Sequence, residues 1–240
     1  MARHDPPIGE RDAQWRPYPV AAEVRGAVRR FPVEGDEVTA LDRVDLEVPV
    51  GWMTVVSGPS GSGKSTLLAV LGCMQRPDEG TVTIGPTDVL ALSRRGRREL
   101  RRDRLGIVLP QPSENLLDHL DAAANVRWSA HQRRGSDRSD DLEVLLESVG
   151  LSAASSRGVR ELSGGEQQRL AVACALAGGP ELVILDEPTA SLDRSNAISL
   201  VEVLAAVAAQ GSTMVIATHD PLVIEAGNVV VELDHGRRVR

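Results

Sequence analysis

The sequence predicts an α/β fold with a mainly parallel sheet, because short strand-like segments alternate with helical ones along most of the chain. Several strand-like segments are continuous apolar runs, the kind that parallel sheets bury on both faces. The segments between them space their apolar residues as one face of a helix does. At 240 residues, the chain is long enough for one such domain, with or without a modest subdomain.

The first half of the chain opens with residues 1–22, which are rich in Pro, Arg and Asp and are predicted to form an N-terminal extension. Strand patterns follow in "EVRGAVRRF", "TALDRVDLEV" and "TVVSG". The segment "KSTLLAVLGCM" spaces Leu67, Leu71 and Met74 along one helical face, and "RPDEG" ends that helix. Two further strands are predicted in "TVTIG" and "GIVLPQ".

The second half continues the alternation. Residues 115–150 are mostly helical, with a break at the charged "RRGSDRSDD". A helix with clear start and stop signals lies in "LSGGEQQRLAVACALAGGP", and the apolar strand "ELVILDEP" follows it. A helix at about 195–210, the strand "TMVIATH" and a hairpin in "VVVELDHGRRVR" complete the chain.

Composition excludes some functional classes. The net charge of −7 argues against a dedicated nucleic-acid binder. The apolar runs are far shorter than the ~20 residues of a membrane helix, and the first residues lack the apolar core of a secretory signal. Cys73 and Cys174 are expected to be small buried residues of a reducing compartment. The arginine run "RRGRRELRRDR" fits either a solvated helix face or an interaction surface.

A glycine-rich loop predicts phosphate binding. "GPSGSGKS" fits the pattern G-x-x-x-x-G-K-[ST] between a strand and a helix, and it holds Lys64, the only lysine of the chain. Its glycines let backbone N–H groups turn toward phosphate oxygens at the start of a helix. Lys64 would reach the terminal phosphates, and the Ser65 hydroxyl suits Mg²⁺. The nucleotide-binding candidates are Gly58, Pro59, Ser60, Gly61, Ser62, Gly63, Lys64, Ser65 and Thr66.

Two carboxylates follow the strand "LVIL". Asp186 and Glu187 are expected at the carboxyl edge of the sheet, where open α/β folds bind ligands. Asp186 would support the Mg²⁺ shell, and Glu187 would polarise a water for attack on a γ-phosphate. Taken alone, these acids could simply solubilise the end of a strand, but the phosphate loop favours the functional interpretation.

A second helix start lies in "ELSGGEQQR". Ser163 and Glu166 have the spacing of a capping box. Gly164 and Gly165 leave the N–H groups of the first turn bare, which predicts a second anion site. By itself this segment would be read as a capped helix without a ligand, and only its combination with the other motifs favours an anion site.

From about Glu23 to Arg240 the sequence resembles the ABC-type ATPase family. The resemblance rests on "GPSGSGKST", Gln111 in "VLPQP", "LSGGEQQR", "VILDEP", "SLD" and "ATHD", in the order and at the spacings of that family. It implies a P-loop NTPase (RecA-like) core with a mainly parallel sheet, an N-terminal antiparallel β subdomain and an inserted α-helical subdomain at about 112–170.

The resemblance also implies roles for individual residues, with ATP and Mg²⁺ as ligands. Gln111 would sense Mg²⁺ and couple to a membrane partner, and His219 would contact the γ-phosphate. Asp193 would lie at the seam of a head-to-tail dimer, in which each ATP is held between one Lys64 loop and the Ser163–Gly165 segment of the other copy. Phe31 matches the aromatic position that stacks on adenine, although a core phenylalanine is the alternative.

The stretch "LSRRGRRELRRDRLGIVLPQ" is similar to the branch that drives lipoprotein release and macrolide or peptide efflux. Pro110 and Pro112, where that branch commonly has aromatics, predict a stiffer loop around Gln111.

The resemblance therefore implies the ATP-hydrolysing subunit of a transporter, peripheral on the cytoplasmic face of the membrane. Because no spanning segment is predicted, the permease is expected on a separate chain. The alternative from another class is a soluble ABC ATPase that acts on nucleic acid or ribosomes. The segment between Gln111 and Leu162 is too short for the long coiled coil of chromosome-associated members, and one cassette rather than two is present. We therefore expect no nucleic-acid partner. Glu187 and His219 argue against a third reading, a nucleotide sensor without turnover.

Overall fold

A central parallel sheet organises the computed structural model, which describes residues 18–33, 36–133 and 142–240. The sheet has six strands in the order β10-β9-β3-β8-β7-β6. All its neighbouring pairs are parallel except β9 and β10, so the predicted mainly parallel sheet and the terminal hairpin are confirmed. The strands are β3 (Met53–Ser57), β6 (Leu105–Val108), β7 (Leu182–Asp186), β8 (Met214–Ala217), β9 (Val229–Asp234) and β10 (Arg237–Arg238).

A second, antiparallel sheet has the order β2-β1-β4-β5. It consists of β1 (Val20–Val33), β2 (Asp36–Pro49), β4 (Glu79–Ile84) and β5 (Thr87–Asp88). This sheet is the antiparallel N-terminal part that the family resemblance predicted. Strand β1 begins at Val20, three residues before the predicted strand start at Glu23, and residues 1–17 of the predicted extension lie outside the described part of the chain.

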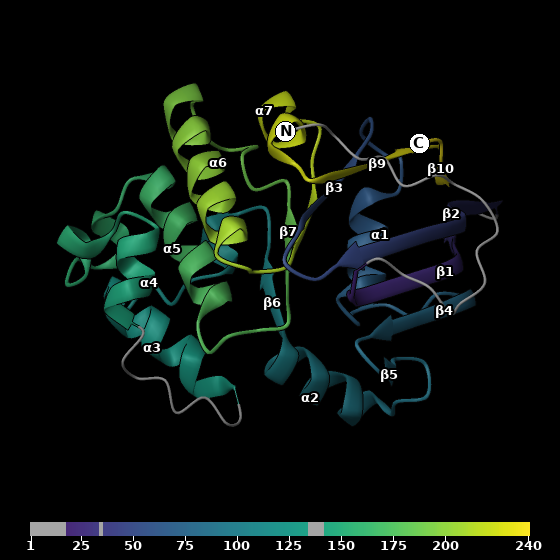
Figure 1. Ribbon diagram of the computed structural model, residues 1–240, viewed down its shortest axis with the longest axis horizontal. Helices are drawn as coiled ribbons and strands as arrows, with labels where there is room; N and C mark the ends of the chain where they lie inside the picture. The colour runs from purple at the N-terminus through teal and green to yellow at the C-terminus, as the bar shows by residue number, and fades with distance from the viewer. Residues whose placement is uncertain (1–17, 34–35, 134–141) are drawn as a thin grey trace.

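Helices cover the parallel sheet (Figure 1). They are α1 (Lys64–Leu71), α2 (Arg94–Arg104), α3 (Ala122–Gln132), α4 (Leu142–Ser148), α5 (Gly164–Leu176), α6 (Arg194–Ala209) and α7 (Pro221–Ala226), with short 3₁₀ turns η1 (Pro112–Glu114), η3 (Ser152–Ala154) and η4 (Val159–Glu161). Helices α3 to α6 lie on one side of the sheet, and α1 with the antiparallel sheet lies on the other (Figure 1). None of the helices among the described residues has the length and apolar character needed to cross a membrane.

Two predictions for the helices need comment. Met74 was expected on the apolar face of α1, but this helix ends at Leu71 with Gly72 as its C-cap, and the Met74 residue is 47% exposed. The chain turns away at Cys73, which has a φ of 57°. The predicted break at 133–141 lies outside the described residues except for Arg133. The helical subdomain proposed for 112–170 contains α3, α4 and the start of α5, and its boundaries stay a prediction.

The core is divided by the parallel sheet, because successive side chains of a strand point to opposite faces. In β7, Val183 and Leu185 pack into the cluster that contains α5 and α6. Ile184 packs into the other cluster, with α1 and the antiparallel sheet. Cys73 and Cys174 are buried free thiols, as predicted, and burial raises their pKa to about 11 and about 12. Because β7 is packed on both faces, the position of its carboxyl end, and therefore of Asp186 and Glu187, is fixed by the core.

Candidate functional site

The glycine-rich loop folds around the Lys64 side chain, which is 6% exposed. Its Nζ donates hydrogen bonds to the carbonyl oxygens of Gly58 (2.8 Å) and Pro59 (2.9 Å). Lys64 is the first residue of α1. The N-cap of this helix is Gly63, which has a φ of 101°, and no side chain caps the N–H groups of the first turn. The loop therefore gathers an ammonium group and the positive end of a helix dipole at one place, which suits a phosphate.

Close backbone neighbours explain two of the glycines. A Cβ at Gly58 would lie 2.1 Å from the carbonyl oxygen of Leu233, and a Cβ at Gly63 would lie 2.3 Å from that of Ala40. The C-terminal hairpin also braces the loop, because the Gly236 N–H donates to the Ser62 carbonyl at 3.0 Å. Sequence reasoning found the loop but missed this brace. The glycines signal a close neighbour without saying which segment provides it.

The carboxyl end of β7 brings acidic oxygens to the loop. The Ser65 hydroxyl donates to Asp186 Oδ1 at 3.1 Å. Burial raises the pKa of Asp186, and the bond from Ser65 opposes that rise. A hydroxyl and a carboxylate side by side are hard oxygen donors of the kind that Mg²⁺ accepts, and substrate phosphates with water commonly complete its shell. The residues present thus fit the predicted metal.

Glu187 is the centre of the polar contacts at this edge. Its Oε1 lies 3.8 Å from Lys64 Nζ and 2.9 Å from His219 Nδ1, and its Oε2 accepts a hydrogen bond from Thr218 Oγ1 at 3.0 Å. The residue has a φ of 44°, which is uncommon outside glycine, and its N–H donates to Ala217 O at 2.8 Å. The structure thus holds one carboxylate between the lysine and the histidine. Thr218 was missed from the sequence, although a threonine at the end of an apolar strand beside His219 offered a signal.

The second glycine pair starts α5, as predicted. Ser163 Oγ accepts from the Glu166 N–H at 3.3 Å, and Glu166 Oε2 accepts from the Ser163 N–H at 2.8 Å. A Cβ at Gly165 would lie 2.2 Å from Asn196 Oδ1, so α5 begins directly against the start of α6. Asp193 is the N-cap of α6 and accepts from the Asn196 N–H at 2.9 Å, which lowers the pKa of its carboxyl group. The structure thus brings Ser163–Gly165 and Asp193 together.

The two glycine-rich segments are not joined in one chain. Among the described residues, no hydrogen bond or ion pair links Ser163–Gly165 to Gly58–Thr66. Gln111 follows β6, whose Val108 pairs with Leu185 of β7, so both strands end at the same edge of the sheet. The Gln111 carbonyl accepts from Asn115 Nδ2 at 2.8 Å.

Phe31 lies on β1 and is half-buried. It belongs to neither of the two hydrophobic clusters, and the Arg29 guanidinium carbon lies 4.7 Å from the centre of its ring. The position is on the antiparallel sheet rather than on the edge that holds Lys64 and Asp186.

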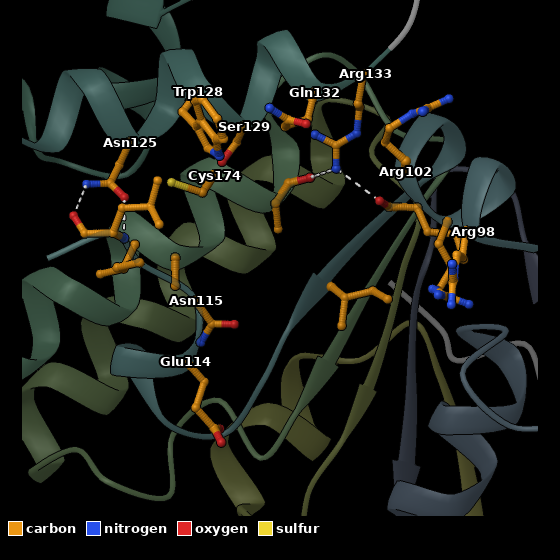
Figure 2. A pocket seen from close by; sticks show the side chains of 17 residues that line it. Arg98, Arg102, Glu114, Asn115, Asn125, Trp128, Ser129, Gln132, Arg133 and Cys174 are labelled. Carbon is orange, nitrogen blue, oxygen red and sulfur yellow. Dashed lines mark hydrogen bonds between the residues drawn. The ribbon is translucent and has the colours of Figure 1, made fainter. Parts of the chain in front are cut away.

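A groove of about 500 Å³ lies between α2 and α3 (Figure 2). Arg98 and Arg102 of α2 line one side, and Trp128 and Gln132 of α3 line the other. Glu114 of η1, three residues after Gln111, is also among the lining residues. From the arginine run, Arg98, Arg101 and Arg102 thus line this groove, and the Arg102 guanidinium also pairs with Asp103.

Known proteins resemble this chain over most of its length. The profile of the family described as ABC transporter matches residues 41–190. A macrolide export ATP-binding/permease protein of Burkholderia cenocepacia is 36% identical over 220 residues, which are 90% of this chain and 32% of that protein. Its counterpart in Agrobacterium fabrum is 37% identical over 215 residues, which are 89% of this chain and 33% of that protein. The chain spans about a third of the length of these curated relatives.

Solved structures agree with the fold. A dimeric ATP-binding cassette in a post-hydrolysis state with ADP and Pi superposes with a TM-score of 0.79 at 30% identity, over 91% of this chain and 97% of that one. A Clostridium perfringens protein that is part of an ABC transporter complex gives a TM-score of 0.80 at 26% identity, over 92% of this chain and 88% of that one. The predicted P-loop NTPase fold is thereby confirmed.

Proposed function

The chain is a member of the ABC transporter family, and on that premise we propose that it is the ATP-hydrolysing subunit that drives a membrane permease. The observation that carries the proposal is the position of Glu187, whose carboxylate contacts both Lys64 and His219 beside the Ser65–Asp186 pair. The subunit would sit on the cytoplasmic face of the membrane. The names of the relatives, which are macrolide export ATP-binding/permease proteins, favour an exporter.

The proposed reaction is in-line attack of water on the γ-phosphate of ATP, which breaks the bond to ADP and releases phosphate. Glu187 would orient the water by accepting a hydrogen bond from it, and its carboxylate would take the proton that the water loses as the new P–O bond forms. Lys64 would neutralise charge on the terminal phosphates, and His219 would hold the γ-phosphate while its own Nδ1 contacts Glu187. Mg²⁺, when bound by Ser65 and Asp186, would share the remaining negative charge, and Gln111 would complete its surroundings.

Two copies are needed for a complete site in this proposal. The Lys64 loop of one copy would face Ser163–Gly165 of the other, and Asp193 would lie at the seam because it packs beside that segment. Phe31 would stack on the adenine. Closure would bury the nucleotide, and hydrolysis would reopen the pair.

Glu187→Gln tests the chemistry. The variant keeps an acceptor for Thr218 but loses the charge, so we expect phosphate release to fall at least about 100-fold while MgATP produces a stable dimer in size-exclusion chromatography. Glu181→Gln is the matched control, because Glu181 lies at the opposite end of β7 and pairs with Arg104. Persistent hydrolysis in Glu187→Gln would remove this carboxylate from its role.

The groove between α2 and α3 supports the permease part of the proposal. It offers arginines beside an exposed Trp128 and adjoins η1, so a shift around Gln111 would reach it directly. We propose that it receives a cytoplasmic segment of the permease that carries carboxylates and an apolar side chain.

Charge reversal tests this docking. The full-length protein that carries both Arg98→Glu and Arg102→Glu should no longer copurify with a multi-spanning permease. Arg95→Glu, on the same helix but paired with Glu99 outside the groove, should retain the permease. Copurification of RNA or ribosomes in place of a permease would favour the nucleic-acid alternative.

A further inference from the structure

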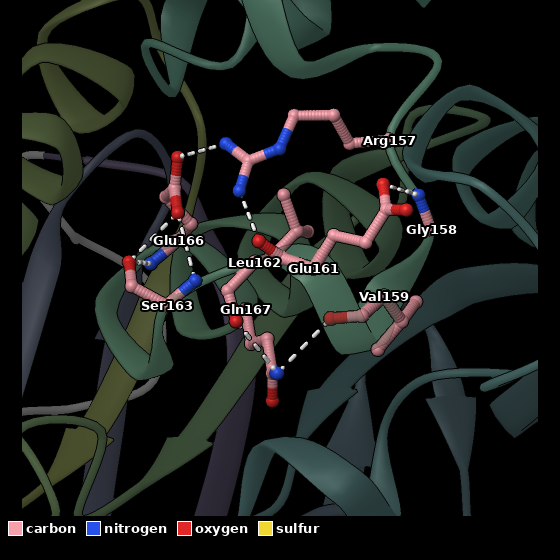
Figure 3. A network of polar contacts seen from close by, with 8 residues as sticks. All are labelled: Arg157, Gly158, Val159, Glu161, Leu162, Ser163, Glu166 and Gln167. Carbon is pink, nitrogen blue, oxygen red and sulfur yellow. Dashed lines mark hydrogen bonds and ion pairs between the residues drawn. The ribbon is translucent and has the colours of Figure 1, made fainter.

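Arg157 contacts the start of α5 from outside the glycine-rich segment (Figure 3). Its Nη1 donates to Glu166 Oε1 at 3.0 Å, and its Nη2 donates to the carbonyl oxygen of Glu161. The other carboxylate oxygen of Glu166 accepts from both the N–H and the hydroxyl of Ser163, each at 2.8 Å. The Arg157 guanidinium thus contacts both the carboxylate that caps α5 and the backbone of the turn that precedes this helix.

The Glu166 carboxylate stabilises the helix but works against an anion at the same place. A negative charge in the first turn interacts well with the helix dipole. Hydrogen bonds from Ser163, with the Arg157 guanidinium adding to them, keep the pKa of Glu166 below its usual range, so the group is ionised at neutral pH. A phosphate brought to the N–H groups of Gly164 and Gly165 would therefore meet a fixed negative charge less than one helical turn away.

We propose that Arg157 is a positioning residue for the ATP-bound dimer: it offsets the charge of Glu166 and fixes the turn Leu162–Gly165, so that α5 can receive the terminal phosphate held by a second copy. This inference rests on the proposed function, in which Ser163–Gly165 faces the nucleotide of the other subunit.

Hydrogen bonds to neighbouring elements hold the backbone of Arg157 and the turn before α5 in place. The Arg157 carbonyl accepts from the Ala122 N–H at 3.0 Å, at the start of α3. Gln167 Nε2 donates to the carbonyls of Val159 and Leu162, both at 3.0 Å, which secures the same loop from the other side. Within the described residues, Arg157 is the cation that pairs with Glu166.

The test is ATP-dependent dimerisation in a Glu187→Gln background, measured by analytical ultracentrifugation. Because the pair is partly exposed, with side chains 40% and 23% accessible, we expect Arg157→Ala to weaken dimerisation by about fivefold. Arg157→Lys should recover most of that loss. Arg157→Ala with Glu166→Gln should also recover it, because the unbalanced charge is then gone. The loss in Arg157→Ala should shrink between about 0.05 and about 0.5 M salt.

Arg160→Ala is the matched control. Arg160 lies three residues after Arg157, in η4, and its substitution removes the same charge, but its partner is Asp118 at 3.4 Å and its side chain is 81% exposed. It should dimerise like the parent.

Three outcomes would overturn the inference: Arg157→Ala dimerises like the parent, Arg160→Ala is equally impaired, or the double variant is no better than Arg157→Ala. The third would mean that Arg157 is purely structural. Binding of a fluorescent ATP analogue to the monomer separates the two proposals. Because Arg157 is proposed to act on the nucleotide held by the other copy, Arg157→Ala should leave binding to the monomer unchanged. If the Glu187→Gln parent binds the analogue but never dimerises, the dimer of the proposed function fails as well.

Discussion

Two helices of this chain begin at glycine-rich segments, and their N-termini are finished differently. Helix α1 has Gly63 as its N-cap, with no side-chain cap and no acidic residue in its first turn. Helix α5 has Ser163 as its N-cap and closes a capping box with Glu166. The first helix therefore leaves its N–H groups to be satisfied by something else, whereas the second satisfies part of its own.

The difference indicates two kinds of anion site: α1 suits phosphate by itself, whereas α5 would only complete a site formed with a second copy. At α1, the uncapped turn and Lys64 both favour negative charge, so this element can hold phosphate without help. At α5, the capping carboxylate favours the helix and opposes an anion, so in our proposal binding there depends on how Arg157, which pairs with that carboxylate, and a second copy present the turn. Variants at each helix should therefore differ in which step they disturb, nucleotide binding or dimer formation.

The largest effect is expected for Lys64→Arg, which asks whether α1 needs a lysine or only a cation. The Lys64 Nζ is enclosed by the carbonyls of Gly58 and Pro59, and a planar guanidinium is too wide for that space. We expect ATP turnover to fall at least about 100-fold, measured as phosphate release. Circular dichroism should show an unchanged fold. Turnover near the wild-type rate would mean that charge alone is required at α1.

A smaller effect on the same loop is expected from Gly58→Ala. The added Cβ would lie 2.1 Å from the Leu233 carbonyl, so the loop and the C-terminal hairpin must separate. Gly61→Ala is the matched control, because Gly61 has a φ of 78° with nothing within 4 Å of the new Cβ. Strain alone at Gly61 should cost about 1–2 kcal/mol.

Urea denaturation should show Gly58→Ala at least about 2 kcal/mol less stable than Gly61→Ala. Nucleotide affinity should fall with it, because the brace formed by Gly236 and Ser62 would be lost. Equal stability of the two variants would show that the hairpin does not support the loop.

Local patterns were enough to predict much of this architecture. The apolar run ahead of Asp186 predicted a buried parallel strand, and Ser163 with Glu166 predicted the capping box that the structure contains. These features depend on neighbouring residues only, which is why they can be recognised in the sequence.

Contacts between distant segments could not be predicted in the same way. The bond from Gly236 to Ser62 and the packing of Asn196 on Gly165 join residues far apart in the chain, and no periodicity encodes them. Arg157 was also missed, because one arginine in a loop before the motif has no pattern of its own. Met74 was misplaced for a local reason, since Gly72 ended α1 earlier than the apolar spacing indicated.

The smallest effect concerns the capping carboxylate of α5 and its dependence on pH. The folded pKa of Glu166 lies below its usual range, with the bonds from Ser163 as the main cause, so the unfolded chain binds more protons at this group. Its contribution to stability is therefore complete above the ordinary glutamate range near pH ~4.3 and is lost as pH falls through the lower folded pKa. Wild-type protein should exceed Glu166→Gln in the free energy of unfolding by about 1 kcal/mol or less at pH ~6.

That advantage should diminish toward pH ~3, as measured by urea denaturation across the range. Glu147→Gln is the control, because it removes an exposed carboxylate of α4. It shows how much the pH dependence of the free energy of unfolding changes when any exposed carboxylate is lost. If the wild-type and Glu166→Gln curves stay parallel as pH falls, Glu166 does not cap α5 as an ion. The contrast between an uncapped α1 and a charged cap on α5 would then be lost, and the need for Arg157 to offset that charge would be lost with it.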